Sequence, residues 1–346
     1  MGERKAMKAS AAANANIAII KYWGRRNDAL RIPTNNSISF TMDDQLQTVT
    51  TVEFSKTLHA DSLVLNGRPG TKTELARVSN FLDNVRAISG KRRVHANVVS
   101  KNSFPTAAGL ASSASGFAAL AAAATKAAGL GRYKDKKQLS ALARLGSGSA
   151  SRSIYGGAVE WLTGKRKDGS DCYAVQLSPP ERWKDLRNVI AITSSKEKRI
   201  SSTDAMARTV RTSEMFKCRL ESVESRLRIV RKAILERDFA ALAPTIMQES
   251  DSMHAVMLDS WPPITYLNGI SLEIMHKVVE LNESYGHGQR NAVAAYTFDA
   301  GPNAHIYTTA KYERQVQKLL AEMEGIEKVL VCRVGEGVRY PRKHLF

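Results

Sequence analysis

A stretch of small residues between Pro105 and Gly116 has the composition of a phosphate-binding loop. Side chains this small let backbone N–H groups approach an oxyanion, and serine hydroxyls can bind phosphate oxygens or Mg²⁺. The alanine-rich run that follows predicts a helix, whose N-terminus adds partial positive charge. A closely packed helix N-cap would also select serine and glycine, so this segment alone leaves both interpretations open.

Three other segments place a charged side chain beside a strand or a turn. Arg152 ends the loop Gly146–Arg152 and could hold a carboxylate or phosphate through two hydrogen bonds, although an exposed arginine after a turn would look the same. Lys21 ends an apolar strand, where it could face a site or extend from the sheet edge into solvent. Asp299 lies between a strand and a Gly-Pro turn, so it could act on a ligand or cap the turn. The segment Asp259–Ile264 is predicted to be a structural loop.

The common nucleotide-binding motifs do not occur in the sequence. Gly164 and Lys165 are followed by Arg166 and lack the upstream glycine of a P-loop. Gly146 and Gly148 lack the third glycine of the dinucleotide-binding fingerprint and follow a predicted helix. Any nucleotide must therefore bind through a different loop.

The 346 residues carry 51 Lys and Arg against 33 Asp and Glu, a net charge of +18. A nucleic-acid-binding protein would show a dense basic stripe with interleaved aromatic residues. The longest basic runs hold only three residues, at 91–93 and 165–167, and aromatic residues make up 7% of the chain. A solvated basic surface explains most of these charges better than a nucleic-acid partner.

Membrane and secreted classes are also disfavoured. The longest apolar run, Phe117–Ala124, is far shorter than the roughly 20 residues that cross a bilayer. The N-terminus is charged, so we expect no secretory signal. Cys172, Cys218 and Cys332 lie far apart, which predicts neither a disulfide framework nor a zinc site and suits the cytoplasm.

Hydrophobic periodicity predicts strands early in the chain and long helices later. Alternating β-branched residues predict strands at 37–42 and 48–54, and Asn66-Gly67 predicts a hairpin turn. Further strands are expected at 158–161, 173–177, 189–193, 292–298 and 328–334. Helical spacing predicts helices at 75–88, 109–129, 136–145, 202–235 and 271–281, with a loop at 146–149.

This order of elements favours an α+β fold, because it lacks the regular strand–helix alternation of a doubly wound sheet. The change in texture near residues 193–198 predicts two domains, 1–195 and 196–346.

Several motifs together resemble one family over nearly the whole chain. They are Lys21–Gly24 (KYWG), Pro33–Ser39 (PTNNSIS), Phe104–Ala114 (FPTAAGLASSA) and Tyr296–Ala304 (YTFDAGPNA). In this order they resemble the mevalonate diphosphate decarboxylases of the GHMP kinase superfamily. The resemblance implies two GHMP kinase lobes, the first similar to domain 2 of ribosomal protein S5, with the active site in the cleft between them. The first lobe would hold the ATP phosphate loop, and the second the substrate cleft and the catalytic aspartate.

The family's reaction is the ATP-dependent decarboxylation of (R)-5-diphosphomevalonate to isopentenyl diphosphate, with release of ADP, phosphate and CO₂. By resemblance, Asp299 is the base or orienting group at the 3-hydroxyl, and Lys21 counters the charge that develops there. Arg152 would hold the substrate carboxylate. These three residues are the expected catalytic set.

The resemblance also assigns binding residues. The ATP and Mg²⁺ loop would comprise Gly109, Leu110, Ala111, Ser112 and Ser113, with Ser113 as the candidate Mg²⁺ ligand. The substrate would contact Asn16, Tyr22, Arg77, Ser147, Ser149, Arg152 and Ser202. The expected partners are the small-molecule substrate and a second copy of the chain in a homodimer, in the cytoplasm.

Four positions depart from the family pattern, and two related activities need separating. Arg25 stands where the family usually has lysine, and Thr203 where several bacterial members have arginine. Ser151 and Ser115 replace the more common cysteine and alanine.

Mevalonate 3-kinases lack the three catalytic residues, which argues against that activity. Phosphomevalonate decarboxylases, which use the monophosphate, keep those residues but depart from the motifs at 22–24 and 33–37, so the diphosphate substrate is favoured.

Overall fold

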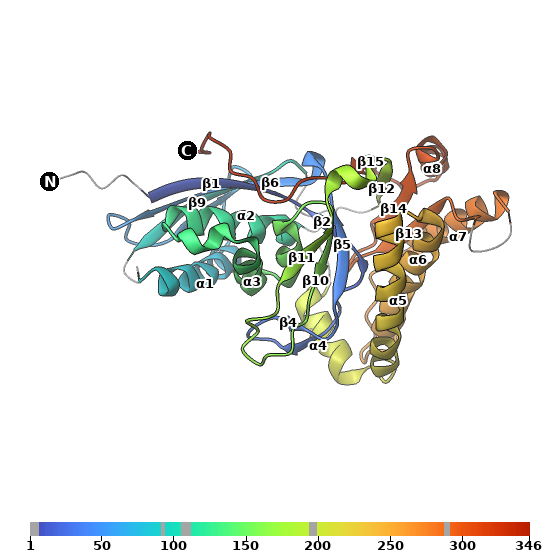
Figure 1. Cartoon of the computed structure of the whole chain (residues 1–346), viewed down its shortest axis with the longest axis horizontal. Helices are drawn as coiled ribbons and strands as arrows, with labels where there is room; N and C mark the ends of the chain where they lie inside the picture. The colour runs from blue at the N-terminus through green and yellow to red at the C-terminus, as the bar shows by residue number, and fades with distance from the viewer. Residues whose placement is uncertain (1–6, 91–93, 105–111, 194–198, 287–290) are drawn as a thin grey trace.

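The computed structural model describes residues 7–90, 94–104, 112–193, 199–286 and 291–346. Within them, two sheets from the first half of the chain and one sheet formed mainly by its second half lie side by side, with helices packed around them (Figure 1). The mixture of antiparallel sheets and long helices agrees with the predicted α+β class. The predicted division at residue 195 stays a prediction.

The first sheet has the strand order β1-β6-β9-β7-β8. Its strands are β1 (Met7–Asn14), β6 (Gln47–Ser55), β9 (His95–Asn102), β7 (Ser62–Leu65) and β8 (Arg68–Pro69). The expected turn at Asn66-Gly67 joins β7 to β8, and both residues have the positive φ angles that such a tight turn requires. Only the pairing of β7 with β9 is parallel in this sheet.

Helices α1 (Lys72–Ser89), α2 (Ser112–Ala127) and α3 (Lys136–Gly146) pack near this sheet. Helix α2 is buried on nearly all sides, because its alanine side chains let neighbouring elements approach closely. The expected helix at 75–88 is confirmed as α1, which begins with a capping box between Thr71 and Glu74.

The second sheet, in the order β11-β10-β5-β2, leads directly to the candidate site. Its strands are β11 (Ala174–Ser178), β10 (Ala158–Trp161), β5 (Ser37–Thr41) and β2 (Asn16–Ile20). Every residue of β2 and β5 is buried, so these strands form a rigid platform. A short ribbon of β3 (Arg25–Asn27) and β4 (Ile32–Pro33) follows β2.

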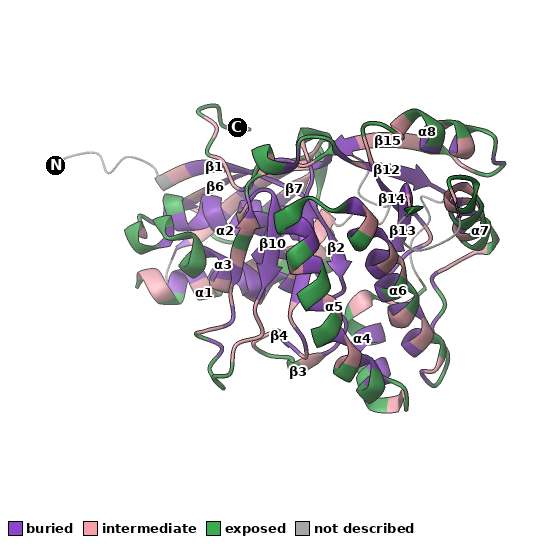
Figure 2. Cartoon of the chain, turned by 45° about the vertical axis from the view of Figure 1, so that its right-hand side comes forward, coloured by how far each residue is buried: buried purple, intermediate pink, exposed green. Residues whose placement is uncertain are grey.

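The third sheet, in the order β13-β14-β12-β15, is antiparallel throughout. It consists of β13 (Ala294–Phe298), β14 (Ala304–Thr309), β12 (Leu186–Ile192) and β15 (Lys328–Arg333). Helices α5 (Phe216–Glu236) and α6 (Phe239–Leu258) pack against each other, and α6 contacts both β2 and β13. The strands β12, β13 and β14 are almost wholly buried, while the outer face of α5 is exposed (Figure 2). Helices α7 (Gly269–Ser284) and α8 (Glu313–Ala321) complete this region.

Two predicted elements were wrong. The expected single helix at 202–235 is two helices, α4 (Ser202–Thr212) and α5, because the carboxylate of Asp259 accepts hydrogen bonds at 2.6 Å from the Ser213 hydroxyl and at 2.9 Å from the Met215 N–H. These contacts hold the chain outside helical geometry at the break. They also confirm that the segment beginning at Asp259 is structural.

The expected loop at 146–149 is instead the end of α3 followed by a 3₁₀ helix, η4 (Gly148–Ile154). Glycine is required here because neighbouring rings lie close to the backbone. A Cβ atom on Gly146 would overlap the ring of Phe117, and one on Gly148 would meet Trp161 and Tyr22. Tight packing therefore stabilises a helix in a segment whose glycines and serines predicted a loop, and this helix carries Arg152.

Candidate active site

A cavity of about 610 Å³ lies where the end of β2, helices η4 and α4, and the turn after β13 meet. All predicted site residues within the described part of the chain line it: Asn16, Lys21, Tyr22, Arg77, Ser112, Ser113, Ser147, Ser149, Arg152, Ser202 and Asp299. Gly109, Leu110 and Ala111 lie outside the described residues. Segments far apart in the sequence therefore contribute to one cavity.

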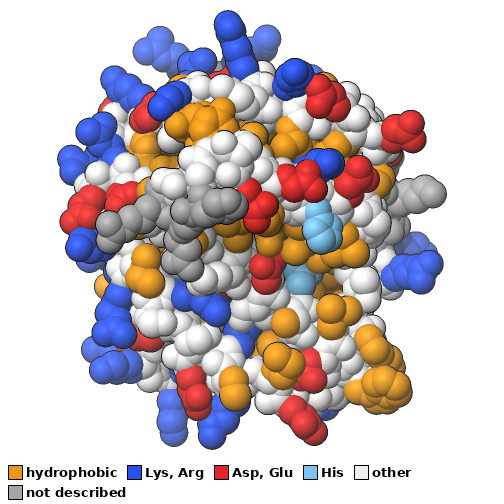
Figure 3. Space-filling model, turned by 90° about the vertical axis from the view of Figure 1, so that its right-hand side faces the viewer, with side chains coloured by type: hydrophobic (Ala, Val, Ile, Leu, Met, Phe, Trp, Pro, Cys, Tyr) orange, Lys and Arg blue, Asp and Glu red, His pale blue; other side chains and the backbone are white. Residues whose placement is uncertain are grey.

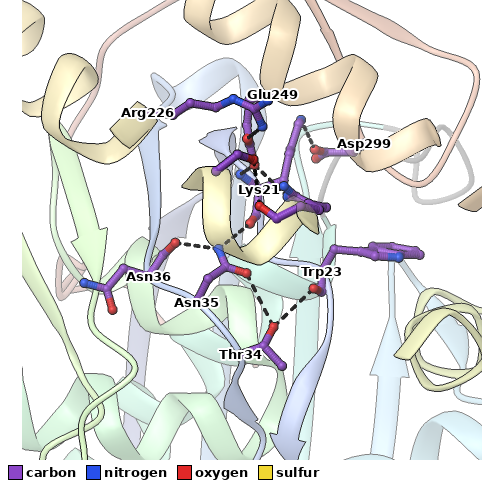
Figure 4. Close-up of polar contacts among 10 residues, drawn as sticks. Lys21, Trp23, Thr34, Asn35, Asn36, Arg226, Glu249 and Asp299 are labelled. Carbon is purple, nitrogen blue, oxygen red and sulfur yellow. Dashed lines mark hydrogen bonds and ion pairs between the residues drawn. The ribbon is translucent and has the colours of Figure 1, made fainter. Parts of the chain in front are cut away.

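Lys21 and Asp299 form an ion pair at the wall of this cavity. The Lys21 ammonium donates to the Asp299 carboxylate at 2.7 Å (Figure 4). The lysine side chain is only 1% exposed, whereas that of the aspartate is 30% exposed and lines the cavity. Burial lowers the pKa of Lys21, and the charge and hydrogen bond of Asp299 act to raise it.

The backbone positions of this pair follow from the strands that precede them. Lys21 comes directly after β2, and Asp299 comes directly after β13. The carbonyl of Lys21 also accepts a hydrogen bond from the Asn35 amide at 3.0 Å (Figure 4). Two strand ends from different sheets thus bring a cation and a carboxylate together.

Arg152, on η4, is almost fully buried and lines the cavity. Its Nε donates to Asn16 at 2.9 Å and to Ser39 at 3.0 Å, and its Nη1 donates to Ser37 at 2.6 Å. Burial lowers the pKa of Arg152 to about 10, so the guanidinium remains charged at neutral pH. A fixed, planar cation of this kind is suited to hold a carboxylate.

Serine hydroxyls line the part of the cavity near the start of α2. Ser113 lies 3.4 Å from Ser147, which lies 3.2 Å from Ser149, measured between hydroxyl oxygens. Helix α2 begins at Ser112, so its N-terminal N–H groups and partial positive charge lie beside these hydroxyls. This chemistry matches what a phosphate group requires.

Arg25, Arg31 and Arg77 give one part of the cavity a strong positive charge. Burial is the main cause that lowers the pKa of Arg77, and the nearby charges of Arg31 and Arg25 lower it further. The pKa of Arg31 is lowered by burial and then by Arg25. Arginines that repel one another in a partly buried place are stabilised by a bound polyanion.

Two of the four residues that depart from the family pattern, Arg25 and Thr203, lie in this region. Arg25 donates to the Tyr22 hydroxyl at 2.6 Å and to the Thr203 hydroxyl at 3.3 Å. Arg25 therefore links the ribbon after β2 to the first turn of α4, next to Ser202.

Sequence reasoning did not identify several residues that line the cavity. These are Ala18, Trp23, Arg31, Arg68, Glu74, Gly148, Ser201, Met206, Met253 and Ala300. Arg68 and Glu74 form an ion pair at 2.8 Å, in which Arg68 lowers the pKa of Glu74 to about 2. Of these residues, Arg31 could most easily have been identified from the sequence, because it follows Arg25 by six positions across a short turn.

An apolar recess of about 180 Å³ adjoins the cavity and shares Glu74, Arg77, Ser112 and Ser113 with it. Its walls are mainly aliphatic and aromatic side chains, namely Leu63, Leu65, Val78, Val98, Phe117 and Leu120. A flat apolar group attached to a phosphate chain would fit this combination of surfaces.

Two further observations limit the kind of site present. Among the described residues, there is no group of three or more His, Cys, Asp or Glu side chains that could hold a metal ion. In the same part of the chain, no helix is both long and apolar enough to span a membrane. On the face shown in Figure 3, both basic and acidic side chains are present.

Comparison with known proteins gives a consistent result for both halves of the chain. The diphosphomevalonate decarboxylase-like N-terminal domain matches residues 13–174, and the mevalonate 5-diphosphate decarboxylase C-terminal domain matches residues 188–338. The diphosphomevalonate decarboxylase of Candida albicans is 44% identical over 328 residues, which cover 92% of this chain and 88% of that protein.

Solved structures agree with this. The crystal structure of mevalonate diphosphate decarboxylase from Staphylococcus aureus has a TM-score of 0.88 and 37% identity, covering 97% of this chain and 98% of that one. The structure of MDDEF in complex with MVAPP, AMPPCP and magnesium has a TM-score of 0.88 and 36% identity, covering 97% and 99%. With a fold and a cavity that agree with these matches, the chain belongs to the diphosphomevalonate decarboxylase family.

Proposed function

We propose that this protein catalyses the ATP-dependent decarboxylation of (R)-5-diphosphomevalonate to isopentenyl diphosphate, ADP, phosphate and CO₂. One observation carries the proposal. The Lys21–Asp299 pair and the buried Arg152 line a single cavity that also contains four further arginines and a group of serine hydroxyls. This combination supplies a base, a counter-charge, a carboxylate-binding group and two kinds of phosphate-binding surface.

Asp299 is the group that acts on the 3-hydroxyl of the substrate. Its carboxylate accepts or orients the hydroxyl proton while the oxygen attacks the γ-phosphorus of ATP. Lys21 keeps this carboxylate in place through the 2.7 Å hydrogen bond and offsets negative charge on the oxygen that becomes phosphorylated. The burial of the lysine strengthens this electrostatic effect, since water is excluded from its ammonium group.

Arg152 holds the substrate carboxylate for the second part of the reaction. The C3–O bond breaks and its electrons leave with the phosphate. The bond between C1 and C2 breaks next, C1 departs as CO₂, and the electron pair forms the C2=C3 double bond. Arg152 contributes by positioning, because its own hydrogen bonds to Asn16, Ser37 and Ser39 fix the guanidinium before substrate binds.

The further arginines that line the cavity favour a diphosphate over a monophosphate. Arg25, Arg31 and Arg77 together carry three positive charges, which matches the higher charge of a diphosphate. Contacts from Tyr22, Asn16, Ser147, Ser149 and Ser202 complete the proposed substrate site. A phosphomevalonate decarboxylase, the second candidate, would leave part of this positive charge without a partner.

The serines at the start of α2 and the adjoining apolar recess fit ATP. Ser112 and Ser113 would bind its phosphate groups beside the helix N-terminus, and the apolar recess would receive the adenine. Magnesium bound with the nucleotide would neutralise phosphate charge, and Ser113 is the candidate protein ligand. The complex of MDDEF with AMPPCP and magnesium supports ATP and magnesium as the cofactors.

We also expect a cytoplasmic homodimer. Light scattering of the purified chain near and below micromolar concentration tests the expected dimer, and a monomer at all concentrations would contradict it.

Asp299→Asn tests the proposed function most simply. We expect kcat to fall by about 10²- to 10⁴-fold, the usual contribution of a positioned acid or base, with little change in ATP affinity. Asp251→Asn is the matched control, because Asp251 lies outside the cavity and contacts the Tyr296 hydroxyl. An Asp299→Asn variant that retains more than a few per cent of wild-type turnover would show that the assigned role is wrong.

A further inference from the structure

Glu249 is a fully buried carboxylate that lies behind the candidate site and does not line the cavity. It is on α6, and it accepts hydrogen bonds from two arginines of α5. Arg219 contacts one carboxylate oxygen at 2.6 Å, and Arg226 contacts the other at 2.9 Å (Figure 4). Burying an ionised carboxylate is costly unless it is paired in this way.

The same carboxylate contacts the backbone of Lys21. The oxygen that binds Arg219 also accepts a hydrogen bond from the Lys21 N–H at 3.1 Å. Because Asn35 binds the Lys21 carbonyl, the peptide groups on both sides of this residue are fixed by buried side chains. The direction in which the lysine side chain leaves the strand end is thereby set.

The next residue along α6 makes the corresponding contact near Asp299. The Ser250 hydroxyl accepts a hydrogen bond from the N–H of Phe298 at 3.0 Å, immediately before the aspartate. Two consecutive buried residues of one helix therefore hold the backbone beside both members of the ion pair. Helices α5 and α6 already share an apolar interface. The contacts of Glu249 and Ser250 with the two strand ends are therefore not required to pack these helices together.

We propose that Glu249, held by Arg219 and Arg226, is a positioning residue that orients Lys21 toward Asp299 and supplies a negative charge behind it. The inference rests on the proposed function, because it assigns Lys21 a part in the reaction. It predicts that the charge of Glu249 affects turnover although the side chain touches neither substrate nor ATP.

Charged groups on three elements act on Lys21, namely Asp299 after β13, Glu249 on α6 and Arg152 on η4. Two titratable histidines also interact with it, His254 on α6 and His305 on β14. Asp299 and Glu249 raise the pKa of Lys21, while burial and Arg152 lower it. Burial lowers the pKa of each histidine to about 4, so both are neutral where Lys21 titrates.

Glu249→Gln keeps the shape of the side chain and removes its charge. Because the lysine ammonium loses a nearby anion, the pKa of Lys21 falls. In a profile of kcat against pH, the alkaline limb, where kcat declines as Lys21 loses its proton, should therefore move to lower pH by about one unit. We expect kcat at pH 7.5 to fall by roughly 10- to 100-fold, with less than a threefold change in the KM for ATP. A merely structural role would lower the melting temperature and leave the limb in place.

Glu160→Gln is the matched control. Glu160 is also buried and is bound by an arginine of α5, Arg231, at 2.7 Å, but it has no contact with Lys21. This variant should lose stability without a shift of the alkaline limb. A shift of equal size in both variants would overturn the proposal.

Arg226→Gln provides a second test with the opposite sign. It removes a positive charge from the partly exposed edge of the cluster, so the negative charge of Glu249 is less compensated and the limb should move up by about half a unit. If Glu249→Gln does not fold, this variant decides, and a limb at or below the wild-type pH overturns the proposal. Absence of turnover in the wild-type protein would refute the proposed function itself, whereas normal turnover in Glu249→Gln would refute only this inference.

Discussion

Replacing Arg152 by lysine retains the positive charge in the cavity and removes the planar guanidinium. The arginine now serves two purposes, because it binds Asn16, Ser37 and Ser39 inside the protein and, in the proposed function, the substrate carboxylate in the cavity. A lysine ammonium cannot reach all of these partners from one position. The substitution therefore separates the charge of the group from its geometry.

The size of the effect follows from the contacts that are lost. One charge-assisted hydrogen bond to the substrate is worth about 1.5–3 kcal/mol, which corresponds to about 10- to 150-fold in kcat/KM. Loss of one or two internal hydrogen bonds, at about 1 kcal/mol each, should also lower the melting temperature by several degrees. In the proposed function ATP binds elsewhere in the cavity, so its KM should change by less than about threefold.

The assay is steady-state turnover with Mg-ATP and varied diphosphomevalonate, beside a thermal melt of each protein. Arg144→Lys is the control, because Arg144 is similarly buried, binds the carbonyls of Gly169 and Cys172, and does not line the cavity. It should lose stability and retain kcat/KM. If Arg152→Lys keeps kcat/KM within threefold of the wild type while its melting temperature falls as in the control, carboxylate binding by Arg152 is refuted.

Two further predictions concern phosphate recognition and acid stability. Arg77→Ala should lower kcat/KM about tenfold more for the diphosphate than for the monophosphate substrate, which is the value of one charge-assisted hydrogen bond. The control Arg228→Ala, at an exposed position, should change kcat/KM for neither substrate. Equal losses with both substrates would contradict diphosphate recognition by Arg77. Burial lowers the pKa of His305 to about 4, so the unfolded state takes up a proton first, and stability should fall as the pH drops from about 6.5 to about 4. In urea unfolding, His305→Gln should reduce the slope of the unfolding free energy against pH by up to about 1.4 kcal/mol per pH unit. The control His59→Gln, at an exposed position, should leave this slope unchanged. Identical slopes in the wild type and both variants would be inconsistent with a buried neutral histidine at position 305.

Local sequence signals predicted the strand ends that carry the reactive groups. Lys21 follows an apolar run and Asp299 precedes a Gly-Pro turn, so both positions could be placed at the ends of strands. The strand β14, in contrast, was missed because nearly all of its residues are buried, which removes the alternation that marks a half-exposed strand. The nine-residue helix α8 was missed because it is too short for a clear periodic pattern.

The remaining features depend on contacts between distant segments. The break between α4 and α5 is fixed by Asp259, which lies more than 40 positions further along the chain. The sequence predicted no helix around Glu249, and only the packing of α6 against α5 and β2 shows that this residue is buried, paired and bound to Lys21. The roles assigned to Asp299, Lys21 and Arg152 came from resemblance to a family and stay predictions.

The central claim is best tested by following ADP and CO₂ release together in a steady-state assay with Mg-ATP. Diphosphomevalonate, phosphomevalonate and mevalonate are offered in parallel. We expect equal amounts of ADP and CO₂, with the diphosphate strongly preferred over the other two substrates. A preference for the monophosphate, or ADP formation without CO₂, would contradict the proposed reaction.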